Sequence, residues 1–114
     1  MAVYEQLVAT VRQYQTAKLQ SQNKPVPKNE FDWTAFDMKK LLEEVGELAE
    51  LFILYNNRPY YNYPELRGEI ADVAIVLACI ASRIGIEISP AMDEKLEVLK
   101  QRLVEMGHTC KEAT

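Results

Sequence analysis

Apolar residues recur at steps of three and four in four separate segments of the chain, and this periodicity predicts an all-α protein. The first segment covers residues 2–22, where polar side chains fill the face opposite an apolar stripe. That stripe consists of Val3, Leu7, Val11 and Tyr14. Pro25 and Pro27 forbid a regular helix in the next stretch, so residues 23–33 are predicted to form a loop.

The second and third segments predict the two helices at the centre of the fold. Thr34 and Asp37 have the spacing of a capping box, which predicts a second helix over about 34–55. The third predicted helix covers about 64–84 and is apolar nearly all round between residues 70 and 81. A helix without a polar face is usually buried, so we expect the third helix to be central.

The fourth segment has a clear beginning and end. Gly85 ends the third helix, and Ser89 and Pro90 are suited to the N-cap and first position of the fourth. Gly107 is expected to close the fourth helix. The apolar stripe of this helix consists of Leu96, Leu99, Leu103 and Met106.

Two pairs of carboxylates interrupt the apolar surface of the two central helices. Glu44 and Glu47 lie in the second helix, Glu69 and Asp72 lie in the third, and each pair is spaced i, i+3. Residues three apart share a helix face, so each pair can aim at one point. Glu44 falls at the edge of its apolar stripe and should be partly buried, and a buried carboxylate needs a partner.

The partner of these carboxylates is either a set of basic side chains or a metal ion. The candidate cations for a buried salt bridge are Arg58, Arg67 and Lys39. A salt-bridge network would need about as many cations as anions, so the excess of carboxylates favours a metal ion. Oxygen ligands without histidine suit Mg²⁺, with Mn²⁺ as the alternative ion, rather than zinc. Mg²⁺ held in this way keeps positions for substrate phosphates, which predicts phosphoryl or nucleotidyl hydrolysis.

Composition and charge narrow the class of protein further. The 114 residues are expected to form a single domain over 1–114, with the modest core of so short a chain completed by oligomerisation. The net charge of −4 argues against nucleic acid or an anionic membrane surface as a partner. The longest apolar run contains Asp72 and is too short to span a bilayer. Cys79 and Cys110 suggest no disulfide framework, so a cytoplasmic location is expected.

Two groups of aromatic residues each have two interpretations. Phe31, Trp33 and Phe36 either cover the core, or one or two of them stack on the ring of a ligand. The tyrosine-rich turn at 56–64 is either a lid over the carboxylates or a contact between subunits.

The acidic residues also carry a resemblance to a known family. EEVGE, with Glu43, Glu44 and Glu47, and EIAD, with Glu69 and Asp72, resemble the EExxE…ExxD motif of the MazG-like all-α nucleoside triphosphate pyrophosphohydrolases. The similarity extends over about residues 38–102. It implies a four-helix bundle-like fold and Mg²⁺-dependent cleavage of a (d)NTP between its α and β phosphates, giving (d)NMP and pyrophosphate in nucleotide-pool house-cleaning. It also implies that both carboxylate pairs bind the metal, and that Glu43 is an additional acid that assists the attacking water.

The same resemblance implies roles for basic residues and for a neighbouring subunit. Lys95 and Arg102 correspond to basic positions that contact phosphate in the last helix of the family, while Leu99 stands where several relatives have Asn. Family members are homodimers or homotetramers. One alternative function is that of a phosphoribosyl-ATP pyrophosphatase, which shares the acidic motif. Others are a helical dimer that binds Mg²⁺-nucleotide without cleaving it, and a structural bundle whose acids are salt-bridged.

Overall fold

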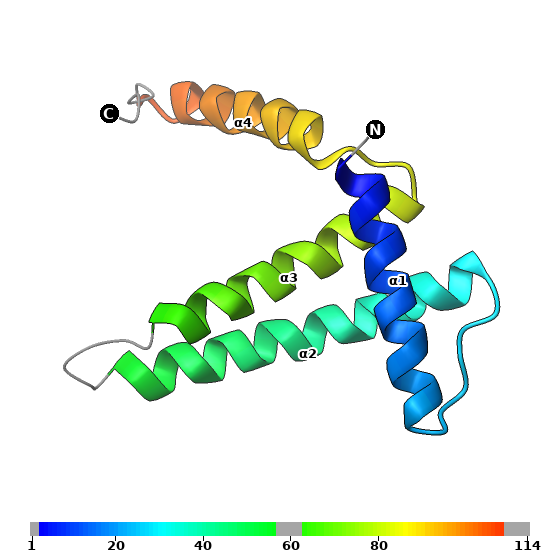
Figure 1. The fold of residues 1–114 in the computed structure, drawn as a ribbon. Coiled ribbons are helices and arrows are strands. Elements are labelled where there is room, and N and C mark those ends of the chain that lie inside the picture. The colour runs from blue at the N-terminus through cyan, green and yellow to red at the C-terminus, as the bar shows by residue number, and fades with distance from the viewer. Residues whose placement is uncertain (1–2, 57–62, 109–114) are drawn as a thin grey trace.

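The computed structural model describes residues 3–56 and 63–108, and these ranges contain four α-helices and no strand (Figure 1). The helices are α1 (Val3–Ser21), α2 (Glu30–Asn56), α3 (Tyr63–Arg83) and α4 (Ile88–Glu105). The prediction of an all-α protein is therefore confirmed. Most of the predicted tyrosine-rich turn lies outside the described residues. None of the described helices is long and apolar enough to cross a membrane.

The centre of the fold is an antiparallel pair of helices, α2 and α3, which lie side by side along most of their length (Figure 1). Helix α1 crosses this pair where α2 begins and α3 ends. The apolar core lies at that crossing. Its buried members are Leu19, Trp33, Val76, Ala78, Cys79, Ile80 and Ala81. Most of them come from the second half of α3, which agrees with the predicted central position of that helix.

Helix α4 extends away from the end of α3 and makes few contacts with the other helices (Figure 1). None of its residues is buried. Leu96 and Leu99, which belong to the predicted apolar stripe, are 50% and 45% exposed. The stripe is present in the sequence, but the single chain supplies no partner for it within the described residues.

The beginning of α2 differs from the prediction. The side-chain Oδ1 of Asn29 accepts a hydrogen bond from the backbone N–H of Asp32 at 2.8 Å, which is the geometry of an N-cap. Thr34 lies inside the helix, where its hydroxyl donates to the carbonyl of Glu30. The predicted capping box at Thr34 is therefore wrong, and Trp33 lies in the first turns of α2 rather than in a loop.

Asp37, the other half of the predicted capping box, is fully buried at the crossing of the three helices. It accepts a hydrogen bond from Gln15 Nε2 of α1 at 3.0 Å and pairs with the guanidinium of Arg83 at the end of α3. The Arg83 side chain is only 2% exposed. A buried charge needs a partner, so this pair fixes the position of α3 against the start of α2.

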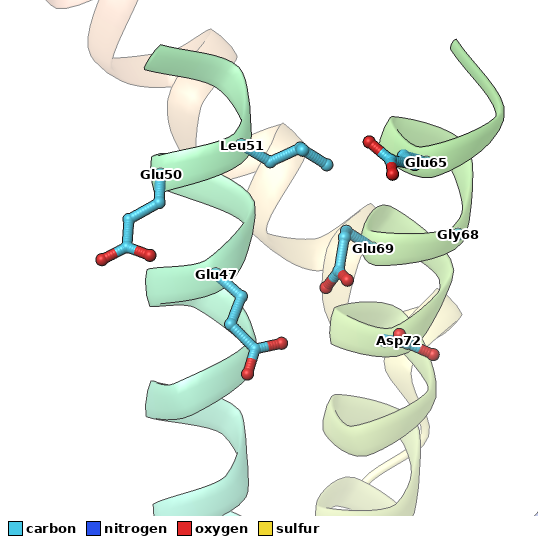
Figure 2. Close-up of a pocket in the computed structure, with 7 residues that line it drawn as sticks. All are labelled: Glu47, Glu50, Leu51, Glu65, Gly68, Glu69 and Asp72. Carbon is cyan, nitrogen blue, oxygen red and sulfur yellow. The ribbon is translucent and has the colours of Figure 1, made fainter. Parts of the chain in front are cut away.

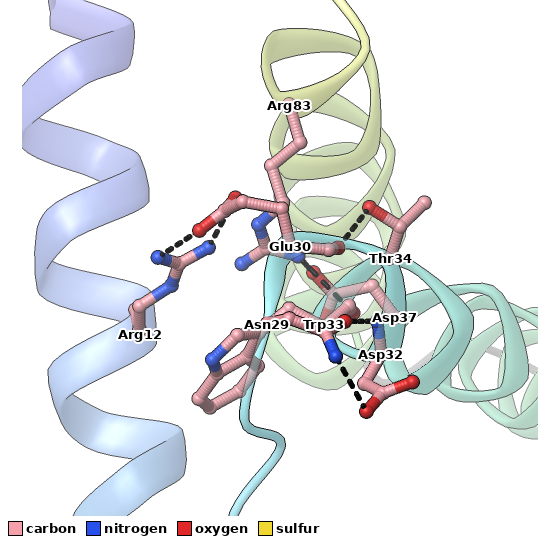
Figure 3. A network of polar contacts seen from close by, with 8 residues as sticks. All are labelled: Arg12, Asn29, Glu30, Asp32, Trp33, Thr34, Asp37 and Arg83. Atoms are coloured by element: carbon pink, nitrogen blue, oxygen red, sulfur yellow. Dashed lines mark hydrogen bonds and ion pairs between the residues drawn. The ribbon is translucent and has the colours of Figure 1, made fainter.

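Trp33 is the aromatic centre of the same crossing (Figure 3). The guanidinium carbons of Arg12 and Arg83 lie 5.2 and 5.6 Å from its ring centroid, and Phe36 meets it edge-on at 5.7 Å. Arg12 also donates to both carboxylate oxygens of Glu30 at 2.7 and 2.9 Å. These contacts attach α1 to the first turns of α2.

The two glycines that were predicted to end helices, Gly85 and Gly107, do so. Gly85 has φ +78°, and the N–H of Ile86 returns to the carbonyl of Ala81 at 2.8 Å, as expected for a glycine that terminates a helix. Gly107 ends α4 with φ +79°.

Helix α4 begins one residue before the serine that was predicted to cap it. Its N-cap is Glu87, which makes no side-chain capping bond, so the predicted N-cap at Ser89 is wrong. Pro90 is tolerated in this first turn because backbone N–H groups there have no acceptor within the helix.

The buried face of α1 is also displaced from its predicted stripe. Tyr14 is 65% exposed, while Gln15 and Leu19 are buried. Because α1 crosses the other helices at one end, only the residues at the crossing are covered.

Candidate metal site

Three carboxylates from the facing surfaces of α2 and α3 converge on one point. Glu44 and Glu47 of α2 and Glu69 of α3 each offer an oxygen, and these three oxygens lie within 4.8 Å of one another. The i, i+3 spacing puts the two α2 residues on one face. Antiparallel packing of α3 then brings Glu69 opposite them.

Figure 2 shows the orientation of these side chains. Glu47 and Glu69 reach from their helices toward each other across the pocket. Glu50 also lines this pocket, yet its carboxylate points away from α3. Glu47 and Glu50 lie only three residues apart on α2, yet only the Glu47 carboxylate is directed toward α3.

The cluster is strongly anionic and partly shielded from water. Glu44 is 8% exposed, as its place at the edge of the apolar stripe predicted. Oε2 of Glu69 is buried and has no hydrogen-bond partner within residues 3–56 and 63–108. The pKa of Glu69 is raised above its ordinary value, first by burial, then by the negative charges of Glu44, Glu47 and Asp72, and by a hydrogen bond shared with Glu44.

Asp72, the fourth predicted ligand, lies one turn beyond Glu69 on α3 and lines the same pocket. Its side chain is exposed, and it is not one of the three carboxylates whose oxygens converge. The pocket has a volume of about 670 Å³. Its lining residues are Glu47, Glu50, Leu51, Glu65, Gly68, Glu69 and Asp72.

A lysine that the sequence analysis did not consider is the cation beside this cluster. Lys40 Nζ lies 3.4 Å from Glu44 Oε1 and 3.7 Å from Glu43 Oε2. The two predicted cations in the described ranges, Arg67 and Lys39, are exposed and appear in none of the ion pairs there, and Arg58 lies outside those ranges. The i, i+4 spacing from Lys40 to Glu44 could have identified the pair.

Trp33 and Phe36 lie near the start of α2, away from the carboxylates. Glu44 lies eleven positions after Trp33, which corresponds to roughly 16 Å along the helix. Trp33 is 5% exposed and in contact with two guanidinium groups, so within the chain it covers the core. Stacking of either ring on a ligand remains a prediction.

The structure does not bring the predicted phosphate-binding residues of α4 to this pocket within one chain. Lys95 and Arg102 are both exposed, and α4 makes few contacts with the other helices. Lys95 instead borders an apolar groove between the end of α3 and the start of α4. To contact a phosphate bound at an acidic pocket, these two residues would need the pocket of another chain, such as a second copy of this protein.

The donors at the cluster suit a hard divalent cation. All of them are carboxylate oxygens, which are the preferred ligands of Mg²⁺ and Mn²⁺. Among the described residues, the buried oxygen of Glu69 has no hydrogen-bond partner, and the single charge of Lys40 cannot neutralise three carboxylates. A divalent ion would supply both the missing charge and the missing contact, and the open pocket beside it leaves room for a substrate.

Comparison with known proteins shows a distant similarity to a nucleotide pyrophosphatase. The chain is 31% identical to dCTP pyrophosphatase 1 of Mus musculus over 97 residues, an alignment that covers 72% of this chain and 57% of the relative. The chain thus spans little more than half the length of that relative. No protein-family model matches the chain, and no solved structure does.

Proposed function

We propose that this protein is a Mg²⁺-dependent nucleoside triphosphate pyrophosphohydrolase of the MazG-like class, which cleaves a (d)NTP to (d)NMP and pyrophosphate. The observation that carries the proposal is the convergence of Glu44, Glu47 and Glu69, with a buried oxygen of Glu69 that finds no hydrogen-bond partner in the described part of the chain. The similarity to mouse dCTP pyrophosphatase 1 supports the reaction class and makes dCTP the first substrate to test. Nucleotide-pool house-cleaning in the cytoplasm is the proposed role.

The residues of the pocket have separate tasks in this reaction. Mg²⁺, or Mn²⁺, bound there would neutralise the phosphate oxygens and activate the attacking water. The three converging carboxylates would hold the ion, and Asp72, which lines the same pocket, would be the fourth ligand. Glu43 is exposed beside Glu44, where it can accept a proton from the water.

The proposed enzyme is a homodimer or homotetramer. The single chain leaves large apolar side chains exposed on α2, α3 and α4, and such surface is favourably covered by another protein. Examples are Leu42, Phe52, Ile70, Met92 and Leu96. A second copy that covers them could also bring Lys95 and Arg102 of α4 to the triphosphate bound at the other chain's carboxylates.

Pyrophosphate release tests the reaction directly. The purified protein is incubated with Mg²⁺ and a panel of NTPs and dNTPs that includes dCTP, and phosphoribosyl-ATP is added as the competing substrate class. The inactive control is Asp72→Asn, and the matched control is Glu50→Gln, because Glu50 lines the same pocket but points away from α3.

We expect the parent and Glu50→Gln to release pyrophosphate with nucleoside monophosphate as co-product, while Asp72→Asn does not. Preference for phosphoribosyl-ATP would assign the protein to that related enzyme instead. If the protein binds Mg²⁺-nucleotide but releases no pyrophosphate, it is a nucleotide-binding module. The acidic pocket would then only bind the nucleotide and not cleave it.

A further inference from the structure

Lys40 and the proposed divalent ion would both bind the carboxylate of Glu44. The ammonium group of Lys40 lies 3.4 Å from Oε1 of Glu44, and Glu44 is also one of the three converging carboxylates. Glu44 is the buried member of the three. Lys40 therefore compensates, in the metal-free chain, the carboxylate whose negative charge is most costly to leave alone.

The position of Lys40 makes simultaneous binding unfavourable. Lys40, Glu44 and Glu47 follow one another at steps of four and three along one face of α2, so the lysine stands at the end of the acidic row. A divalent ion bound at about 2.1 Å from a carboxylate oxygen would lie within a few ångströms of an ammonium paired with that same carboxylate. Like charges at that separation repel each other.

We propose that Lys40 is a positioning residue that acts as a displaceable counter-cation of Glu44. In the metal-free protein it pairs with the Glu44 carboxylate and holds it in place, and it must release that carboxylate when the divalent ion binds. Lys40 thereby lowers the affinity of the pocket for its metal. The Lys40 side chain is 31% exposed, so it can move into water on release. This inference rests on the proposed metal site.

Lys39 provides a matched control. It is the adjacent residue on α2, carries the same charge and is exposed, and it takes part in none of the ion pairs among the described residues. Removing its charge changes the net charge of the protein as much as removing that of Lys40. A difference between the two substitutions therefore reports the contact with Glu44.

The test is titration of the substrate-free full chain with Mg²⁺ and with Mn²⁺ by calorimetry. We expect Lys40→Met to bind the ions about five to ten times more tightly than the parent, because a repelling charge is removed from the pocket. Lys39→Met should stay within about twofold of the parent, and Lys40→Arg, which keeps the charge, should also resemble it. Raising the salt concentration should shrink the effect, since the lysine is partly exposed.

A second measurement keeps the inference testable if Lys40→Met is poorly stable. Without divalent ions, Lys40→Gln should melt below the parent because buried Glu44 loses its cation, and saturating Mn²⁺ should remove that difference. Unchanged or weaker metal binding in Lys40→Met, with tight binding by the parent, would overturn the role of Lys40 and leave the proposed function standing. No divalent binding by the parent would overturn both.

Discussion

Replacing Glu44 by glutamine separates a metal site from a structural salt bridge. The substitution keeps the shape of the side chain and removes its charge. In the metal-free protein, two effects oppose each other: Glu44 is repelled by Glu47 and Glu69, whose oxygens lie within 4.8 Å, and attracted by Lys40 at 3.4 Å. The net change in the free energy of unfolding depends on their relative size.

The structure gives the scale of these effects. Unit charges about 4–5 Å apart interact by about 3–4 kcal/mol at an effective dielectric constant near 20, and by about 1 kcal/mol in bulk water. Glu69 is partly buried, so its repulsion of Glu44 lies near the larger energy, whereas Glu47 is exposed and its repulsion lies near the smaller one. Lys40 is one-third exposed and falls between them. On this scale the repulsion, about 4–5 kcal/mol, exceeds the attraction, which lies between about 1 and 4 kcal/mol, so we expect Glu44→Gln to leave the metal-free protein at least as stable as the parent.

The response to metal should change much more. A ligand at ten times its dissociation constant stabilises the folded state by about 1.4 kcal/mol. The assay is urea unfolding followed by circular dichroism, with EDTA or with Mn²⁺ at that ratio. The parent and Glu50→Gln should gain this stability from Mn²⁺, while Glu44→Gln should not. Loss of several kcal/mol in EDTA by Glu44→Gln, together with no metal response in the parent, would refute the metal site and favour a buried salt bridge.

Three further predictions concern the core, the pH response and the assembly. Asp37→Asn should cost about 3 kcal/mol in urea unfolding because it leaves the buried guanidinium of Arg83 without a counter-charge. Glu30→Gln breaks an exposed pair and should cost much less in the same titration, and equal losses would contradict the assigned burial. Because the pKa of Glu69 is raised in the fold, the metal-free folded state binds its proton more readily than the unfolded state, so stability falls as pH rises from the ordinary carboxyl pKa through the raised one. Melting in EDTA should accordingly show that Glu69→Gln stabilises the protein more at pH 8 than at pH 5, and the reverse trend would count against the crowded carboxylates. Leu96→Asp should shift the mass measured by analytical ultracentrifugation toward the monomer, and an unchanged mass would remove α4 from the proposed subunit contact.

Short-range patterns in the sequence were enough to predict the elements of the fold. The four helices follow from apolar periodicity, and Gly85 and Gly107 mark two helix ends because a positive φ is easily reached only by glycine. The burial of Glu44 was also expected in part from its angular position on one helix. Each of these features depends on residues only a few positions apart, which is why the sequence alone predicts them.

Only the tertiary structure decided which candidate residues meet. Asp37 has the spacing of a capping residue, yet it is buried against Arg83, 46 residues away, and the cap of α2 is Asn29 instead. Local spacing cannot distinguish these outcomes, because the energy of a buried ion pair depends on which helix covers it.

The candidate site divides in the same way. The i, i+3 spacing predicted each carboxylate pair, but the antiparallel packing of α2 and α3 decided that Glu44, Glu47 and Glu69 converge, while Asp72 stays on the pocket wall. The sequence also could not predict where Lys95 lies relative to the carboxylates, because α4 makes few contacts with the other described helices. Periodicity determines which face of a helix is apolar or acidic. What that face meets is determined by long-range packing, which buries apolar surface and pairs buried charges over the whole fold.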